Sequence, residues 1–169
     1  YKLITYSGAF EGDIHNFDVH GLNGISYNII NEENAIWLVV NEQRTASTGV
    51  QWTGNESHLW DYQSKNFLLN DAATEFVAND EVEFTDDATI TTITMNNLMP
   101  VQNALFKNSE KEYIINGNGG FSGNGSLVIN GGGNVRLNIT KSDYTGATII
   151  NNGVVTITEL ADAGTPSSI

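Results

Sequence analysis

Aromatic side chains set among short polar residues are the strongest candidates for a binding site in this sequence. Trp52, Trp60 and Tyr62 lie in the stretch VQWTGNESHLWDYQSKNF, among Asn, Ser, Asp and Gln side chains. Aromatic faces stack on sugar rings while amides bind hydroxyl groups, so this composition is typical of a carbohydrate-binding surface. Large aromatic residues are also mostly buried in folded proteins. Two hypotheses follow, a sugar-binding platform or the core of a small β unit, and we favour the core.

Acidic side chains are concentrated between residues 80 and 87. Glycosidase carboxylates and the oxygen ligands of Ca²⁺ both require two or more acids that converge in space. Glu81 and Glu83 fall on one face of a single predicted strand, and the loop formula of a calcium site is absent. We therefore expect a solvated strand edge whose charges oppose aggregation. A weak Ca²⁺ site at Asp86 and Asp87 stays open, and we predict no other cofactor.

Other chemistries lack the residue spacing that they need. The three histidines, His15, His20 and His58, form no H-E-x-x-H pattern, and the chain has no cysteine, so we predict no metal site for them. A G-x-S-x-G motif is absent, and the run GNGGFSGNG leads into strands, whereas a phosphate loop needs a following helix. A polysaccharide lyase would need clustered Lys or Arg beside acidic ligands, which this sequence lacks. We predict that the chain is not an enzyme.

Charge and hydropathy exclude further classes of partner. The 169 residues include 7 Lys and Arg against 20 Asp and Glu, for a net charge of -13, which repels nucleic acid and anionic lipid. No apolar run approaches the roughly 20 residues of a membrane-spanning helix, and no signal peptide opens the sequence. Because the sequence begins at Tyr1 rather than Met, we expect a fragment or a mature form of a longer protein.

The elements that must position these residues are predicted to be almost entirely strands. Apolar residues alternate over 27–40 around the polar turn NEEN, which predicts a hairpin, and the pattern dissolves over 41–49. We predict three segments: the closing strands of a β unit over 1–45, an aromatic-rich β segment over 46–112, and β-helix coils over 113–169. The predicted fold class is all-β, with a sandwich-like or meandering N-terminal part leading into a right-handed β-helix.

Short apolar pieces separated by Gly and Asn follow residue 113, at spacings typical of a β-solenoid whose coils stack on one another. In the stretch YTGATIINNGVVTI we predict that Ile149 points into the core, opposite to Ile150. We predict that Gly153 forms a corner with positive φ, and that Val155 and Ile157 resume the inward row.

Residues 113–158 resemble the autotransporter-associated β-strand repeat, also called the passenger-associated transport repeat. The block NGNGGFSGNGSLVINGGG is followed by residues that match the repeat pattern Y-T-G-x-T-x-I-x-x-G: Tyr144, Thr145, Gly146, Thr148, Ile150 and Gly153. The stretch WTGNESHLWDYQSKNF followed by NDEVEFTDD is similar to a segment that often precedes such repeats in large exported bacterial proteins. The resemblance implies a right-handed β-helix in a secreted passenger, adhesin or other modular surface protein.

Two functions are compatible with these observations. The first is a non-catalytic structural module that assists export of a large secreted or cell-surface bacterial protein, with its neighbouring domains as partners. The alternative is a carbohydrate-binding module of a polysaccharide-degrading or adhesive surface protein, with polysaccharide or glycan bound at Trp52, Trp60 and Tyr62. Both place the chain outside the cell or on the bacterial surface. A lyase or hydrolase domain elsewhere in a longer parent protein stays open.

Overall fold

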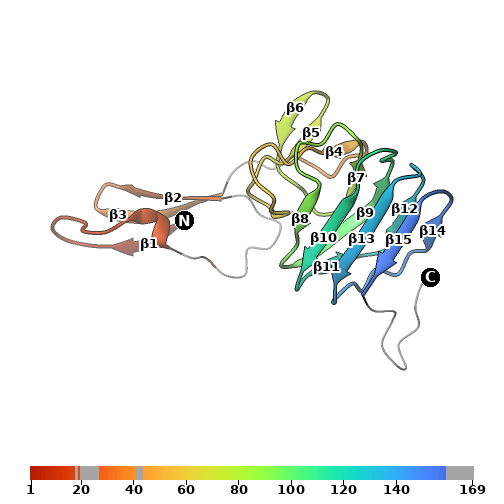
Figure 1. The fold of residues 1–169 in the computed structure, drawn as a ribbon. Helices are drawn as coiled ribbons and strands as arrows, with labels where there is room; N and C mark the ends of the chain where they lie inside the picture. Colours follow the sequence, from red (N-terminus) through yellow and green to blue (C-terminus); the bar gives the residue numbers. More distant parts are fainter. Residues whose placement is uncertain (18, 20–26, 41–43, 159–169) are drawn as a thin grey trace. The chain divides into compact units, whose positions relative to one another are not determined.

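The computed structural model describes residues 1–17, 19, 27–40 and 44–158. These described residues form an all-β protein. One turn of 3₁₀-helix, η1 (Ile14–Asn16), is the one helical element among these described residues. The chain divides into two compact units, residues 1–44 and 45–169. Figure 1 shows both units.

The first unit is a three-stranded antiparallel sheet in the order β1–β3–β2, formed by β1 (Lys2–Thr5), β2 (Tyr27–Glu32) and β3 (Ala35–Val40). The predicted hairpin is confirmed, because β2 and β3 pair over their whole length around a two-residue turn. Glu33 and Asn34 both have positive φ, 52° and 54°, as a turn that matches the twist of paired strands requires.

The second unit consists of two sheets (Figure 1). One sheet has the order β14-β12-β9-β7-β4-β5-β6, with β11 paired to β9, and the other has the order β15-β13-β10-β8. The strands are β4 (Val50–Trp52), β5 (Phe67–Leu69), β6 (Ala72–Thr74), β7 (Asp80–Phe84), β8 (Thr92–Thr94), β9 (Leu98–Phe106), β10 (Tyr113–Gly117), β11 (Gly120–Ser122), β12 (Ser126–Ile129), β13 (Asn134–Ile139), β14 (Thr148–Ile150) and β15 (Val154–Ile157). Among the strands described over residues 45–158, antiparallel pairing is confined to β4–β5 and β5–β6.

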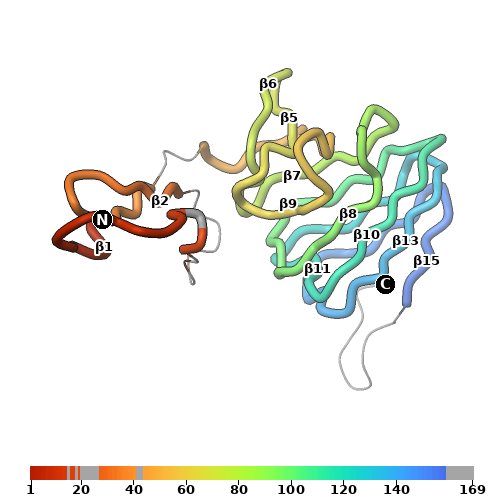
Figure 2. Tube along the Cα trace, turned by 60° about the vertical axis from the view of Figure 1, so that its left-hand side comes forward, coloured from red at the N-terminus to blue at the C-terminus, as the bar shows by residue number. Residues whose placement is uncertain are grey.

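Parallel pairing identifies the second unit as a β-solenoid of about four turns. The chain passes from one sheet to the other and back, through β7 and β8, β9 and β10, β12 and β13, and β14 and β15, as the trace in Figure 2 shows. Val82, Ala104, Leu127 and Thr148 share one register position, so successive coils are 22, 23 and 21 residues long. The strands β7 and β8, on either side of the segment 85–91, therefore lie in different sheets.

The register decides which side chains of the last coil continue the core. Ile150 pairs with the buried Ile129, whereas Ile149 pairs with Val128 and is 40% exposed. The prediction that Ile149 points inward is therefore wrong, because side chains alternate along a strand and the row of Ile129 fixes the parity. Val155 and Ile157 pack against the core as predicted.

Glycines allow the backbones of adjacent coils to approach closely. A Cβ on Gly146 would lie 2.2 Å from the carbonyl oxygen of Gly125, and a Cβ on Gly125 would lie 2.1 Å from that of Gln102. These distances exclude any side chain, so the glycine of YTGAT is required by coil stacking. The predicted corner is also confirmed, since Gly153 has a φ of 101°.

Candidate functional site

The aromatic residues with the strongest sequence case for ligand binding lie in the core. Trp52, Trp60 and Tyr62 are 0%, 1% and 8% exposed. The ring of Trp60 has its centroid 5.4 to 5.9 Å from four phenylalanine rings, those of Phe67, Phe76, Phe84 and Phe121. Rings covered in this way present no face to a sugar, so burial agrees with the core hypothesis for these residues.

The polar residues around the tryptophans hold a loop in place. Asn66 is fully buried, and its side-chain oxygen accepts hydrogen bonds from the backbone N–H groups of Glu56 and Ser57. Its amide nitrogen donates to the hydroxyl of Ser57 and to the carbonyl of Leu59. An amide that already uses four hydrogen-bonding positions has no capacity left for a ligand hydroxyl.

The acids of β7 lie in the interior of a sheet. The strand sits between β4 and β9, so the expectation of a solvated edge is wrong. Outward charges are tolerated here because each has a partner on β9 or directly after it. The Glu83 carboxylate lies 2.7 Å from the Lys107 ammonium, and the Asn103 amide donates to Glu81 at 2.8 Å. The two carboxylates thus link neighbouring coils, and neither faces a second acid as a glycosidase site requires.

Asp86 organises the loop that follows β9. Its carboxylate accepts four hydrogen bonds, from the backbone N–H groups of Ser109, Glu110 and Lys111 and from the Ser109 hydroxyl. These donors, that of Lys111 first, hold the pKa of Asp86 well below its usual range. The donors of this loop already engage both oxygens of Asp86, while Asp87 accepts only long contacts of 3.4 Å from Gln51 and Thr85.

Histidines and other ligating residues do not assemble in the part of the chain that the structure describes. His58 is exposed, His20 lies outside the described residues, and so does the side chain of His15. Within the described ranges, no group of three or more His, Cys, Asp or Glu side chains is placed to hold a metal ion. Over the same residues, no helix is sufficiently long and apolar to traverse a lipid bilayer.

An open depression of about 500 Å³ lies beside the first coil. It is lined by Ala46, Ser47, Thr48, Leu69, Asn70 and Gln102. None of these side chains is ionisable, so the depression offers neither a general acid nor a general base.

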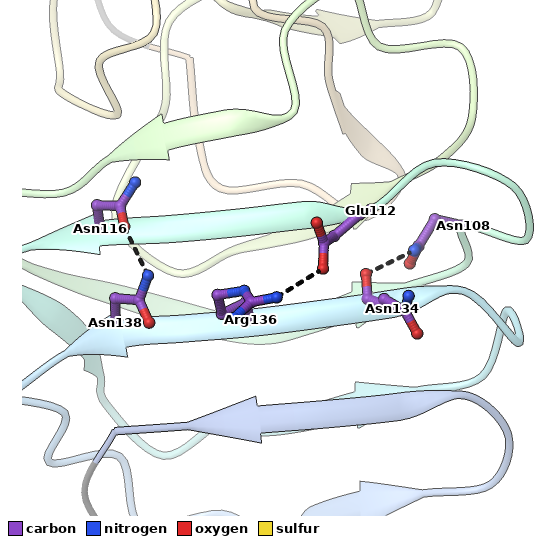
Figure 3. A network of polar contacts seen from close by, with 6 residues as sticks. All are labelled: Asn108, Glu112, Asn116, Asn134, Arg136 and Asn138. Atoms are coloured by element: carbon purple, nitrogen blue, oxygen red, sulfur yellow. Dashed lines mark hydrogen bonds and ion pairs between the residues drawn. The ribbon is translucent and has the colours of Figure 1, made fainter.

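Polar side chains on the outer face of the second sheet join successive coils (Figure 3). The Asn138 amide donates to the side-chain oxygen of Asn116 at 2.9 Å, one coil earlier. Arg136 reaches Glu112 of the preceding coil at 3.3 Å. Beside this face, the buried Asn108, which lies between β9 and β10, donates to the carbonyl of Asn134 at 3.2 Å. This face therefore serves coil-to-coil cohesion.

The two ends of the solenoid differ, and this difference is the feature that stands out as a candidate site. At one end, β4, β5 and β6 extend the first sheet beyond β7, and residues 58–60 pair with Thr94 of β8. The aromatic cluster around Trp60 fills the core there. In the described part of the chain, β14 and β15 at the other end are each paired on one side only.

Apolar side chains are exposed at this end. Ile150, which continues the row of the buried Ile129, is 51% exposed, and Val154, which pairs with the outward Asn134, is 58% exposed. Residues 144–158 include no charged side chain. We define this surface, formed by β14 and β15, as the open end. The lack of charge over residues 144–158 was a sequence signal for this surface, but the single-sided pairing of β14 and β15 was visible only in the tertiary structure.

Comparison with family models, with curated proteins and with solved structures found no match.

Proposed function

We propose that this chain is a non-catalytic structural β-module of a large secreted or cell-surface bacterial protein, and that it assists export of that protein. The observation that carries the proposal is the asymmetric solenoid, with an aromatic cap at one end and, within the described residues, β14 and β15 paired on one side only at the other. A sealed end begins a stack of coils, and an open end provides a template on which strands add in register. The resemblance of residues 113–158 to the autotransporter-associated repeat supports the bacterial surface as its location.

The described side chains support a structural role over a catalytic one. The acids of β7, Asp86 and the outward asparagines each make contacts that join one coil or loop to another. The aromatic residues form a core that is continuous with the inward rows of the coils. Rigidity and directional stacking are the properties that such a construction supplies.

Export assistance follows from the order in which coils can form. Each coil buries its apolar row only when a neighbouring coil is present, so folding that starts at the capped end proceeds coil by coil. A chain that emerges through a membrane and folds on the far side cannot slide back, because reversal would unfold the stacked coils. The free energy of stacking thereby favours outward movement.

Surface display of a reporter tests this role. The chain is placed between a reporter epitope and an outer-membrane anchor, and the epitope is measured on intact bacteria. Leu127→Asp puts a charge into the core, where Leu127 is 2% exposed, and Asn130→Asp makes the matched change at an exposed position. We expect display to fall several-fold for Leu127→Asp alone. Equal display of the two variants, at equal expression, would overturn the export role.

A further inference from the structure

We propose that Asn152 is a modification site, at which the side-chain amide converts spontaneously to aspartate and isoaspartate. Asparagine is chemically labile, and an asparagine followed by glycine carries its own nucleophile, because the backbone nitrogen of the glycine can attack the carboxamide. The sequence contains six Asn–Gly dipeptides, of which five lie in the described residues, at Asn116, Asn118, Asn124, Asn130 and Asn152. These five differ in what the asparagine side chain and the glycine nitrogen contact.

At Asn152 the two reacting groups lie side by side. The backbone N–H of Gly153 donates to Oδ1 of Asn152 at 3.0 Å, which places the nitrogen next to the carboxamide carbon. Asn152 is exposed, so water reaches the amide. Gly153 has no side chain to shield its nitrogen, and its φ of 101° is one that glycine adopts readily. Reacting atoms that are held in contact avoid much of the entropic cost of the attack.

Packing against the preceding coil holds the amide in this orientation. A Cβ built on Gly132 would lie 2.9 Å from Nδ2 of Asn152, so the amide nitrogen lies against a position that glycine leaves open. The corner itself is fixed, because the N–H of Asn151 donates to the carbonyl of Ile129 at 2.9 Å. The carboxamide is therefore held between the coil beneath it and the nitrogen of Gly153.

Two of the other asparagines have a reacting group that is engaged elsewhere. Oδ1 of Asn116 accepts a hydrogen bond from the Asn138 amide at 2.9 Å, one coil away. The nitrogen that follows Asn118 belongs to Gly119, and its N–H donates to the carbonyl of Met95 at 2.8 Å. Attack at either site requires one of these hydrogen bonds to break first.

The remaining two lie at corners that are exposed but arranged differently. Oδ1 of Asn124 accepts from the Thr145 hydroxyl at 3.2 Å, which ties this side chain to the next coil. Asn130 is exposed, and within the described residues no hydrogen bond joins its side chain to the nitrogen of Gly131. A Cβ on Gly131 would lie 2.1 Å from the carbonyl oxygen of Asn108, so the backbone there has little room to move. Asn130 is therefore the natural internal control.

The reaction consumes only water. The nitrogen of Gly153 loses its proton and bonds to Cγ of Asn152, the bond from Cγ to Nδ2 breaks, and the amide nitrogen leaves as ammonia. Water then adds to either carbonyl carbon of the resulting succinimide ring. Addition at Cγ gives aspartate, whereas addition at the main-chain carbonyl carbon gives isoaspartate, in which the chain runs through the former side chain. No atom is oxidised or reduced.

Isoaspartate lengthens the main chain at a corner that has little space. A Cβ on Gly153 would already lie 2.6 Å from the carbonyl oxygen of Gly133 in the preceding coil. Each conversion also adds a negative charge to a chain whose net charge is -13. We expect the amides of β14 and β15 to exchange faster once isoaspartate has formed, because the corner no longer fits the coil beneath. The site does not depend on the export role proposed above.

Peptide mapping by mass spectrometry of the purified full chain, incubated at neutral pH, measures the rate of conversion at each asparagine. Enzymatic methylation of isoaspartate identifies the isomerised product. In urea the following glycine alone sets the rate, so the five sites should react at similar rates. In the folded chain we expect Asn152 to react several-fold faster than Asn130. The rate should rise with pH, because the attacking nitrogen must lose its proton.

Two conservative variants assign the signal. Asn152→Gln lengthens the side chain, which disfavours ring closure, and should abolish the fast conversion while circular dichroism stays unchanged. Asn130→Gln, the matched control, should leave the fast conversion intact. Asn152→Asp carries the charge of the product on a normal main chain. Its hydrogen exchange should therefore resemble that of fresh wild type more than that of aged, isoaspartate-containing wild type.

Two results would overturn the modification site. Conversion in the folded chain could be as fast at Asn130, or at another of the described Asn–Gly dipeptides, as at Asn152. Alternatively, Asn152 could react in urea and not in the folded chain. Either result would show that the contact between Asn152 and Gly153 does not promote the reaction, and neither would bear on surface display of the module.

Discussion

Ile129 and Ile150 occupy the same register position in consecutive coils, yet Ile129 is fully buried and Ile150 is 51% exposed. The pair shows how a solenoid distributes its stability. A coil with neighbours on both sides buries its inward row, and a coil with one neighbour leaves the same side chains half in solvent. Identical residue types at equivalent positions therefore make different contributions to folding.

This difference predicts unequal costs for the same substitution. Ile129→Ala removes a buried side chain and should lower the free energy of unfolding by about 2–5 kcal/mol. Ile150→Ala should cost under about 1 kcal/mol, because much of the side chain is already solvated. Urea denaturation of the two variants at low protein concentration measures both values. Equal losses would contradict the register of β14 against β12.

The two core tryptophans differ in their hydrogen bonding, which separates the effects of replacing each by phenylalanine. The indole N–H of Trp52 donates to the carbonyl of Ile90 at 2.7 Å, whereas the indole N–H of Trp60 is buried and has no hydrogen-bond partner among the described residues. Both substitutions leave a cavity, but Trp52→Phe also leaves a carbonyl unsatisfied, at a cost of about 1–3 kcal/mol. We expect Trp52→Phe to have the lower urea midpoint, and the reverse order would refute this explanation.

Burial of the tryptophans also predicts the outcome of an alanine substitution in a glycan-binding screen. Trp60→Ala should destabilise the chain by about 3–5 kcal/mol, because it empties the centre of the aromatic cluster. Any change in retention on polysaccharide gels should therefore accompany unfolding detected by circular dichroism. Specific retention by the wild type that is lost in a fully folded Trp60→Ala variant would restore the sugar-platform hypothesis.

Asp86 should make stability depend on acidity. Its folded-state pKa is depressed by the hydrogen bonds from residues 109–111, so the charged form is favoured by folding. The stabilisation is fully present above the unfolded-state pKa of about 3.9 and is lost as the pH falls through that value toward the lower folded-state pKa. Urea midpoints measured from pH 7 to pH 3 should decline more steeply for the wild type than for Asp86→Asn. The comparison variant Asp87→Asn, which loses only long contacts, should retain the wild-type slope.

Two glycines distinguish steric exclusion from backbone strain. A Cβ on Gly146 would lie 2.2 Å from a backbone carbonyl oxygen, while a Cβ on Gly49 would meet no atom within 4 Å although its φ is 69°. Gly146→Ala must separate two coils and should cost about 1–3 kcal/mol or more. Gly49→Ala should cost about 1–2 kcal/mol from left-handed strain alone. Hydrogen exchange should show faster exchange in β12 and β14 for Gly146→Ala only.

Local features of the chain could be predicted from the sequence because they depend on residues close together. Alternation predicted the hairpin of residues 27–40 and the inward row of Val155 and Ile157, and a glycine between two apolar pieces predicted the corner at Gly153. Short strands separated by Gly and Asn were sufficient to indicate a solenoid. These signals are set by side-chain periodicity and by backbone sterics, which act within a few residues.

Only the tertiary structure decided which strands are neighbours and therefore which surfaces are free. Partners in the parallel strand pairs of this fold lie 20 to 32 residues apart, and a shift of one position reverses every side chain, which is why Ile149 was assigned to the wrong face. The same long-range pairing placed the acids of β7 inside a sheet and buried Trp60 under rings from distant segments. Composition determined that this chain builds strands, and stacking determined that an aromatic cap lies at one end of the described coils and that β14 and β15 lie at the other.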